Sequence, residues 1–149
     1  MPEPRDRATR KSDLLAALSA PGADVWVATA SPDGKPYLLP LSLGWVDGRV
    51  VIALERTSST ARNIEASRVA RLAVGPTRDV ALIDVELERA VGVDDDGGIG
   101  EAYAAQADWD PRGLAGYVFA VLRPTRIQAW RESNELAGRL LMRDGTWIA

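Results

Sequence analysis

The sequence V-V-I-A-L-E-R-T-S-S-T-A-R-N-I, Val50 to Ile64, joins a strand pattern to a helical one through a turn of hydroxyl side chains. The turn is T-S-S-T, Thr57 to Thr60, and it delivers small polar residues to the start of a helix. The first N–H groups of a helix lack intrahelical partners, and the helix dipole places partial positive charge at the same end. With Arg56 and Arg62 beside it, the turn is a candidate phosphate site. No glycine-rich phosphate loop supports this interpretation, so an ordinary Ser/Thr helix cap remains the alternative.

The composition predicts one globular domain that binds no nucleic acid. A chain of 149 residues with 46% hydrophobic residues is long enough to bury about two-thirds of the surface of its unfolded form. The net charge is −3, whereas nucleic-acid binders usually carry a basic face. Aromatic residues make up only 6%, which disfavours stacking platforms for single strands.

Cysteine and histidine are both absent. Their absence removes disulfides, thiolate nucleophiles, the commonest metal ligand and the usual acid/base group near neutral pH. The acidic triplet Asp94 to Asp96 lacks the spacing of a calcium-binding EF-hand, and we interpret it as a solvated loop that caps a helix. We therefore expect no metal site. Any chemistry must come from a cofactor or from Asp, Glu, Arg, Tyr and backbone groups, and no particular side chain is assigned as catalytic.

The N-terminus, Met1 to Lys11, is polar and lacks the apolar region of a signal peptide. No apolar run approaches the roughly 18 residues of a membrane span. We expect a cytoplasmic protein without a membrane partner, with a flexible tail over residues 1–11 and a single domain over 12–149.

Turn signals divide the chain into strands with a few short helices. Pro40 within a strand indicates an edge, a bulge or a break, and Asp47-Gly48 predicts a two-residue hairpin. The six expected strands are Asp24–Ala30, Pro36–Val46, Arg49–Glu55, Val69–Val74, Asp79–Arg89 and Gly116–Trp130, the last interrupted at Pro124. The expected helices begin at a Ser12 cap and end before Pro21, and then span Thr60–Ala66, Ile99–Ala107 and Glu132–Arg139, followed by a small terminal turn over Arg143–Trp147. These elements predict a mainly antiparallel sheet, and closing it into a barrel would remove its exposed edges.

An ordered series of segments resembles the pyridoxamine 5′-phosphate oxidase-like family. The segments are W-V-A-T-A-S-P-D-G-K-P-Y (26–37), P-L-S-L-G-W (40–45), D-G-R-V-V-I-A-L (47–54) and S-S-T-A-R-N-I (58–64). The resemblance covers about residues 12–90 and, more weakly, 115–130. It implies a six-stranded antiparallel split β-barrel with Greek-key topology and short flanking helices. It also implies a homodimer with FMN in grooves at the dimer interface.

The resemblance further implies where a flavin lies. Its ring would rest along Leu38–Leu43 and Val51–Arg56, and its phosphate would sit at Thr57–Arg62. The family commonly has Ser-Arg-Lys-Ala where this chain has Ser58-Ser59-Thr60-Ala61, so two charged contacts become neutral hydroxyls, and Arg56 and Arg62 are the candidates to compensate. The implied cofactor-binding residues are Pro40, Leu41, Ser42, Leu54, Glu55, Arg56, Thr57, Ser58, Ser59, Thr60, Ala61, Arg62 and Trp109.

The tryptophans have two interpretations each. Trp26 and Trp45 lie in expected strands and are candidates for the core or the dimer interface. Trp109 and Trp130 lie at element ends, where an indole would either cover a flavin ring from the partner subunit or plug the barrel.

The resemblance predicts an FMN-binding oxidoreductase that transfers hydride to or from a small organic substrate. The alternatives are a reductase dependent on the deazaflavin coenzyme F-420, a non-catalytic protein that binds a flavin or another planar ligand, and a structural dimer that has lost its ligand. The chain lacks the His and the C-terminal basic segment with which true pyridoxamine-phosphate oxidases hold their substrate, so that activity is not expected.

Overall fold

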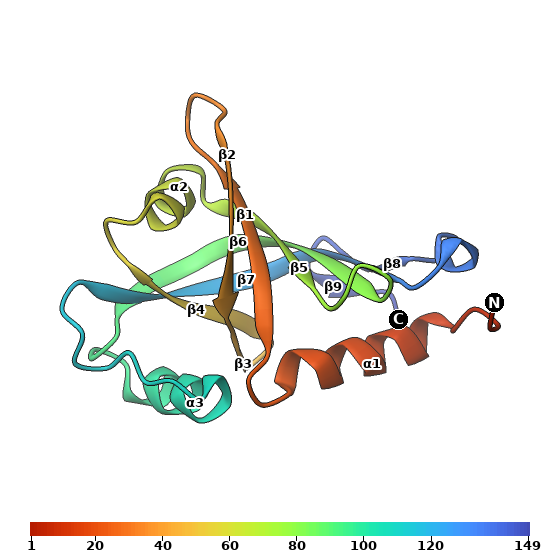
Figure 1. Ribbon diagram of the computed structural model, residues 1–149, viewed down its shortest axis with the longest axis horizontal. Helices are drawn as coiled ribbons and strands as arrows, with labels where there is room; N and C mark the ends of the chain where they lie inside the picture. Colours follow the sequence, from red (N-terminus) through yellow and green to blue (C-terminus); the bar gives the residue numbers. More distant parts are fainter.

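The computed structural model describes residues 1–149 as one large antiparallel sheet with helices packed against it (Figure 1). The mainly β prediction is confirmed, but there are nine strands instead of six. The strands are β1 Asp24–Ala30, β2 Pro36–Ser42, β3 Gly44–Val46, β4 Arg49–Glu55, β5 Val69–Val74, β6 Val80–Gly92, β7 Tyr117–Trp130, β8 Leu140–Arg143 and β9 Thr146–Trp147. The helices are α1 Arg7–Ser19, α2 Ser59–Ser67, α3 Gly97–Ala107 and the 3-10 turn η1 Ser133–Glu135.

The sheet curls without closing, so the expected barrel closure is wrong. Its order is β2-β1-β5-β6-β7-β4-β3, and β8 and β9 extend it from β7. The end strands β2 and β3 are joined through Leu43 alone, yet no ladder links β2 to β3 or β4. Two prolines explain why no strand pairs with the free side of β2. Pro36 and Pro40 lie in this strand and lack an N–H, and prolines in a sheet occupy positions whose N side faces an open edge.

The extra strands have local causes. The strand expected over 36–46 divides at Leu43, whose buried side chain and N–H bond to Ala23 O (3.1 Å) turn the chain from one sheet edge to the other. The helix expected over 132–139 is wrong, since only η1 is helical there, and the terminal turn is the hairpin β8–β9. Pro124 does not interrupt β7, because a register shift opposite Asp84 and Val85 accommodates it.

The predicted hairpins are confirmed. Strands β1 and β2 pair from Asp24–Ser42 to Ala30–Pro36, which makes β2 an edge strand as Pro40 indicated. Strands β3 and β4 pair around Asp47-Gly48. Both of these turn residues have positive φ, 50° and 74°, as a type I′ turn requires.

Two apolar clusters lie on opposite faces of the sheet. The larger fills the inside of the curl between α1, α2 and the strands, and the smaller lies between α3 and the outer faces of β4 and β7. Val50, Ile52 and Leu54 of β4 belong to the first cluster, and Val51 and Ala53 belong to the second. Because β4 is buried on both faces, its end at Glu55 fixes where α2 begins.

The N-terminal helix begins earlier than predicted. Asp6 caps it by accepting from Thr9 N at 2.8 Å, and Ser12, the expected cap, lies inside the helix. The expected tail therefore includes the first turns of α1. No helix is long and apolar enough to cross a membrane.

A cluster that we call the terminal clasp joins this N-terminus to the C-terminal region. It consists of Arg5, Arg10, Asp13 and Glu135. Arg5 donates to both carboxylate oxygens of Glu135, at 3.0 and 2.8 Å, and also to Asp13 at 2.8 Å. The buried guanidinium of Arg10 donates to three backbone carbonyls, one of them Glu135 O at 2.9 Å. The hydrogen bonds from Arg5 lower the pKa of Glu135 to about 2.

Candidate functional site

The turn between β4 and α2 forms a helix N-terminus with free backbone donors. Ser58 caps α2, and its Oγ accepts from Ala61 N at 3.2 Å. The next intrahelical bond runs from Arg62 N to Ser58 O at 3.0 Å. The N–H groups of Ser59 and Thr60 have no acceptor in the protein. Two unpaired donors at the positive end of a helix can bind an anion.

Arg56 precedes this N-terminus in the chain and Arg62 lies in the first turn of α2, and both are exposed. Most arginines of the chain hold a carboxylate or a carbonyl with their guanidinium groups. The guanidinium groups without a partner are those of Arg56, Arg62, Arg126 and Arg143. The turn therefore concentrates cationic donors that the fold itself does not use.

The four hydroxyls of the turn have different environments. Thr57 and Ser59 are exposed, whereas the hydroxyl of Ser58 is engaged in the cap. Thr60 is fully buried, and its Oγ1 is the one buried side-chain polar atom without a hydrogen-bond partner. In this structure an anion at the turn would meet the hydroxyls of Thr57 and Ser59 and the two free N–H groups.

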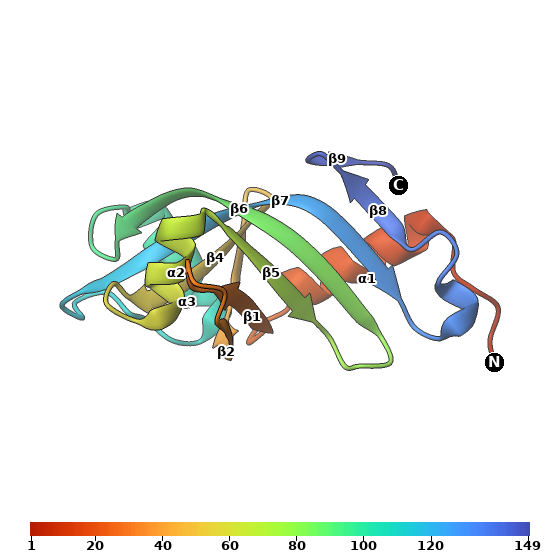
Figure 2. The ribbon, with the colours of Figure 1, turned by 90° about the horizontal axis from the view of Figure 1, so that it is seen from above.

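Asn63 fastens the same helix to β1. Its Nδ2 donates to Thr29 Oγ1 at 3.1 Å, and both side chains are buried. This polar contact was not singled out from the sequence, because the two residues are 34 positions apart and only the fold brings them together. It sets α2 against β1, so the turn has a fixed position next to the β1–β2 hairpin (Figures 1 and 2).

Pro40, Leu41 and Ser42 lie away from the turn, in the edge strand β2. They line a groove of about 820 Å³ together with Trp26 and the end of α1. Because proline positions mark the open edge and backbone groups alternate along a strand, the N–H of Ser42 points to the open edge with the N of Pro40. The edge thus offers a backbone donor for a planar ligand.

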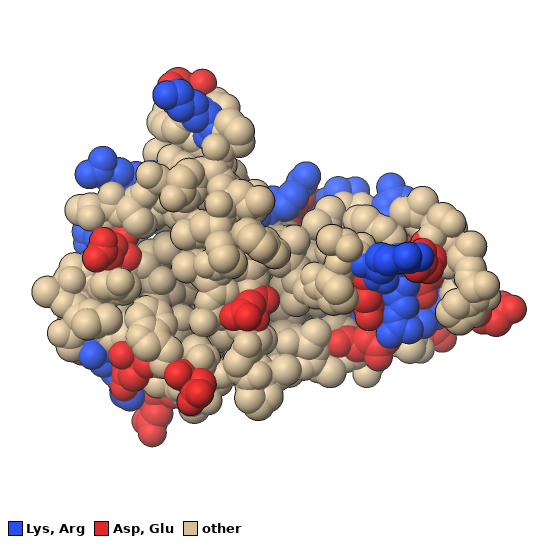
Figure 3. Space-filling view, viewed as in Figure 1, with Lys and Arg blue, Asp and Glu red and all other residues tan.

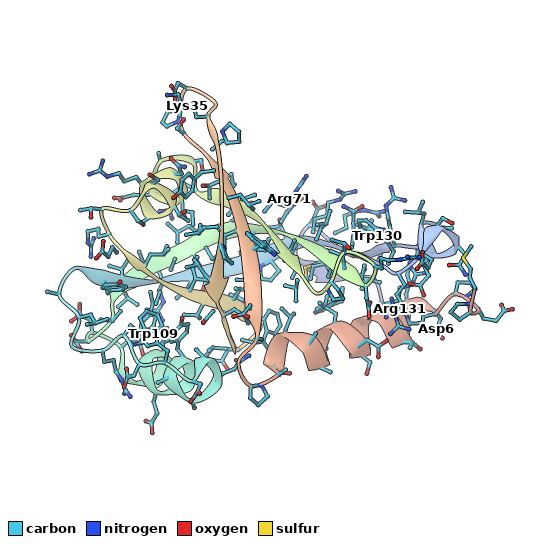
Figure 4. The ribbon with its side chains drawn as sticks, viewed as in Figure 1. Asp6, Lys35, Arg71, Trp109, Trp130 and Arg131 are labelled. Carbon is cyan, nitrogen blue, oxygen red and sulfur yellow. The ribbon has the colours of Figure 1, made fainter.

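Trp109 lies on a third side, against α3. Its ring meets those of Tyr103 and Tyr117 edge to face, with centroids 6.2 and 6.1 Å apart. Tyr117 pairs with Glu55, so this aromatic cluster backs the end of β4 on its outer face. Burial raises the pKa of Tyr103 to about 12. Figure 4 shows Trp109 beside α3 and Trp130 toward the other end of the molecule.

The structure therefore brings together part of the predicted site. The residues from Leu54 to Arg62 form one continuous unit, with Leu54 buried beneath it. The β2 residues lie outside this unit, at the open edge of the sheet, and Trp109 lies outside it against α3. Of the two strand tryptophans, Trp45 packs against the main core, whereas Trp26 is 47% exposed on the outer face of the hairpin.

No protein-family model matches the chain, and no curated protein matches it. Solved structures do. The chain is similar to an F-420 reductase (21% identity, covering 75% of this chain and 94% of that one, TM-score 0.62). It is similar to a pyridoxamine 5′-phosphate oxidase-related FMN-binding protein from Nostoc punctiforme (16% identity, 83% and 78% covered, TM-score 0.53). It is also similar to a heme storage protein from Vibrio cholerae (13% identity, 80% and 93% covered, TM-score 0.62).

These similarities establish the fold. The chain has the pyridoxamine 5′-phosphate oxidase-like split-barrel fold that the ordered sequence segments indicated. One fold hosts many functions, so the activity has to be argued from the site.

Proposed function

We propose that this protein binds a flavin-type cofactor, FMN or the deazaflavin F-420, and uses it to transfer hydride to or from a small organic substrate. The observation that carries the proposal is the β4–α2 turn, where two free helix N–H groups lie between two partnerless arginines. Similar structures include an F-420 reductase and an FMN-binding protein. A heme site is not proposed, because the chain has no His or Cys to ligate iron.

The turn fits a phosphate group. Ser59 and Thr60 offer backbone N–H donors, and Thr57 and Ser59 offer exposed hydroxyls. Arg56 and Arg62 supply charge without breaking any existing ion pair. Neutral hydroxyls replace the Arg-Lys pair that is common in the family. Arg56 and Arg62 are therefore the cations of the turn that would balance the charge of the phosphate.

A flavin ring would lie against the open edge of β2. The N–H of Ser42 would donate to the ring, and the backbone near Leu54 would face it from the other strand. When bound, the cofactor supplies the hydride chemistry, and the protein supplies orientation and exclusion of water. No histidine or cysteine takes part, which suits a reaction without a side-chain acid or base.

We further propose that the protein is a homodimer. The outer face of the β1–β2 hairpin exposes Trp26 at 47% and Leu38 at 60%, beside Pro40. Figure 3 shows largely uncharged surface below the hairpin tip, while charged side chains gather at the two ends of the molecule. Contiguous exposed apolar surface on a soluble protein usually marks an interface. A second copy on this face would cover the groove next to β2.

The test is an absorbance spectrum of the purified protein with FMN and, separately, with F-420, each followed by gel filtration. We expect cofactor bands to coelute with a dimer, and we expect the complex to oxidise a reduced donor faster than the free cofactor does. Binding without turnover over a panel of donors and acceptors would identify a carrier instead. If neither cofactor coelutes, the turn is only a helix cap and the proposal fails.

A further inference from the structure

A second pocket lies beneath α2, on the side of the helix away from the Thr29–Asn63 contact. Its volume is about 250 Å³, and its lining comes from α2 and from β4, β6 and β7. This volume is below the range of about 300–1,000 Å³ for drug-sized ligands, so any occupant must be small. The cofactor proposal does not use this pocket, and Arg56 is the one charged residue that belongs to both sites.

The pocket exists because small residues face one another across it. Ala90 and Ala120 are cross-strand partners of β6 and β7, and Ala61 of α2 lies above them. Larger apolar side chains complete the floor: Leu54, Ile64, Leu87 and Val118. Interiors are normally close-packed, so three alanines around one space leave room for an apolar group of branched-alkyl size.

Charged groups surround the mouth of this apolar space. They are Arg56, Glu65 and Arg68, and they form no ion pair with one another. Arg68 is held in place, since its Nη2 donates to Leu87 O at 3.2 Å while its backbone N–H donates to Ile64 O. The remaining guanidinium donors of Arg68 and all the guanidinium donors of Arg56 are free for a carboxylate. The Glu65 carboxylate can only accept hydrogen bonds, so it suits a donor group that the ligand carries next to its own carboxylate.

We propose that this pocket binds a small acid with an apolar branched side chain and a donor group on the α-carbon, that is, an apolar α-amino or α-hydroxy acid. The arginines hold the carboxylate, Glu65 accepts from the α-amino or α-hydroxyl group, and the alanine-lined space takes the side chain. Each group of the ligand thus has one matching group or space in the pocket.

The test uses three probes of similar shape, titrated into cofactor-free protein by calorimetry. L-Leucine carries all three groups, 4-methylpentanoate lacks the donor, and 3-methylbutylamine lacks the carboxylate. We expect 1:1 binding of L-leucine, because all three of its groups have a partner. Each lost charge-assisted contact costs about a factor of ten, so 4-methylpentanoate should bind about tenfold more weakly, and the amine, which loses its contacts with both arginines, about a hundredfold more weakly. Binding of 2-hydroxy-4-methylpentanoate as tight as that of leucine would identify the hydroxy acid as an equal ligand and support the shared chemistry. Equal binding of all probes, or none, would overturn the proposal.

Two variants locate the site. Arg68 has φ 68°, a conformation that Asn tolerates, so Arg68→Asn removes the cation without straining the turn. We expect this variant to bind L-leucine about tenfold more weakly and to bind the flavin-type cofactor unchanged. Ala90→Leu fills the space and should abolish leucine binding. A filled variant that binds leucine normally would refute the site.

The matched control is Arg62→Gln on the same helix. Arg62 does not line the pocket, so this variant should keep leucine binding while cofactor binding weakens. This contrast separates failure of the pocket from failure of the proposed function.

Discussion

Arginines at the two ends of this molecule lie in opposite environments. In the terminal clasp, Arg5 and Arg10 are largely buried and donate to Glu135, Asp13 and backbone carbonyls. At the α2 turn, Arg56 and Arg62 are exposed, and their guanidinium groups donate to nothing in the protein. The clasp therefore uses its charges to stabilise the fold, and the turn leaves its charges free to bind a ligand.

The two groups of arginines should therefore respond differently to substitution. Paired charges in a buried setting matter when one partner is lost, because the other is left uncompensated. Partnerless surface cations contribute little to stability. Substitutions in the clasp should therefore change stability without changing ligand binding, and substitutions at the turn should do the reverse.

The largest effect is expected from Glu135→Gln. Glu135 is 2% exposed, and removing its charge leaves Arg5 without its main partner, so the free energy of unfolding should fall by about 3–5 kcal/mol. Urea denaturation measures this change. The matched control is Glu132→Gln, because Glu132 pairs with Arg78 at the surface and its loss should cost less than about 1 kcal/mol. Equal effects of the two variants would contradict the structural role of the clasp.

The pH dependence of stability gives a second test of the clasp. The pKa of Glu135 is lowered from 4.5 to about 2 by its hydrogen bonds to Arg5. A lowered carboxyl pKa stabilises the fold fully above the unfolded value, and this contribution is lost as the pH falls from 4.5 toward 2. Glu135 alone should account for about 3 kcal/mol of that loss. The stability difference between the natural protein and Glu135→Gln should therefore shrink across this pH range, and a constant difference would argue against the assignment.

Local signals in the sequence predict the β4–α2 end of the molecule better than the clasp. Ser58 as a cap, Asp47-Gly48 as a hairpin and Pro40 on an edge strand each depend on neighbours in the chain. The Arg5–Glu135 pair spans 130 positions, and the charged N-terminus carries no local pattern that indicates a partner. It was therefore expected to be a tail.

Two errors in the strand assignments differ in kind. The hairpin β8–β9 turns at Asp144-Gly145, with φ of 50° and 77°, and this is the same Asp-Gly signal that located the β3–β4 hairpin. The break at Leu43 has no such signal, because it arises where the chain passes between the two edges of the sheet. The position of Trp109 likewise depends on how α3 packs on β4 and β7, which no local pattern specifies.

At the turn, Arg62→Gln should change the free energy of unfolding by less than about 0.5 kcal/mol. The affinity for the cofactor should fall about tenfold. The physical reason is that the guanidinium has no partner to lose within the fold but would lose a charge-assisted contact to phosphate. Titration of cofactor absorbance measures the affinity. Arg143→Gln is the control, since Arg143 is also partnerless and lies at the end of β8, away from α2. If both variants weaken binding alike, the attraction comes from overall charge instead of the turn.

The smallest predicted effect is that of Thr60→Val, and the same change at Thr29, a second buried threonine near α2, is its comparison. Thr60 Oγ1 has no partner, whereas Thr29 Oγ1 accepts from Asn63. An unsatisfied buried hydroxyl costs free energy, so Thr60→Val should raise the free energy of unfolding by about 1 kcal/mol. The same change at Thr29 leaves the Asn63 amide without its acceptor and should lower the free energy of unfolding by about 1–3 kcal/mol. The two variants make the same chemical change in similarly buried positions, and urea denaturation measures the free energy of unfolding of each. Changes of opposite sign would show that the Thr60 hydroxyl at the start of α2 destabilises the fold, whereas the Thr29–Asn63 contact of the same helix stabilises it. Destabilisation by Thr60→Val would instead mean that this hydroxyl has a partner in solution.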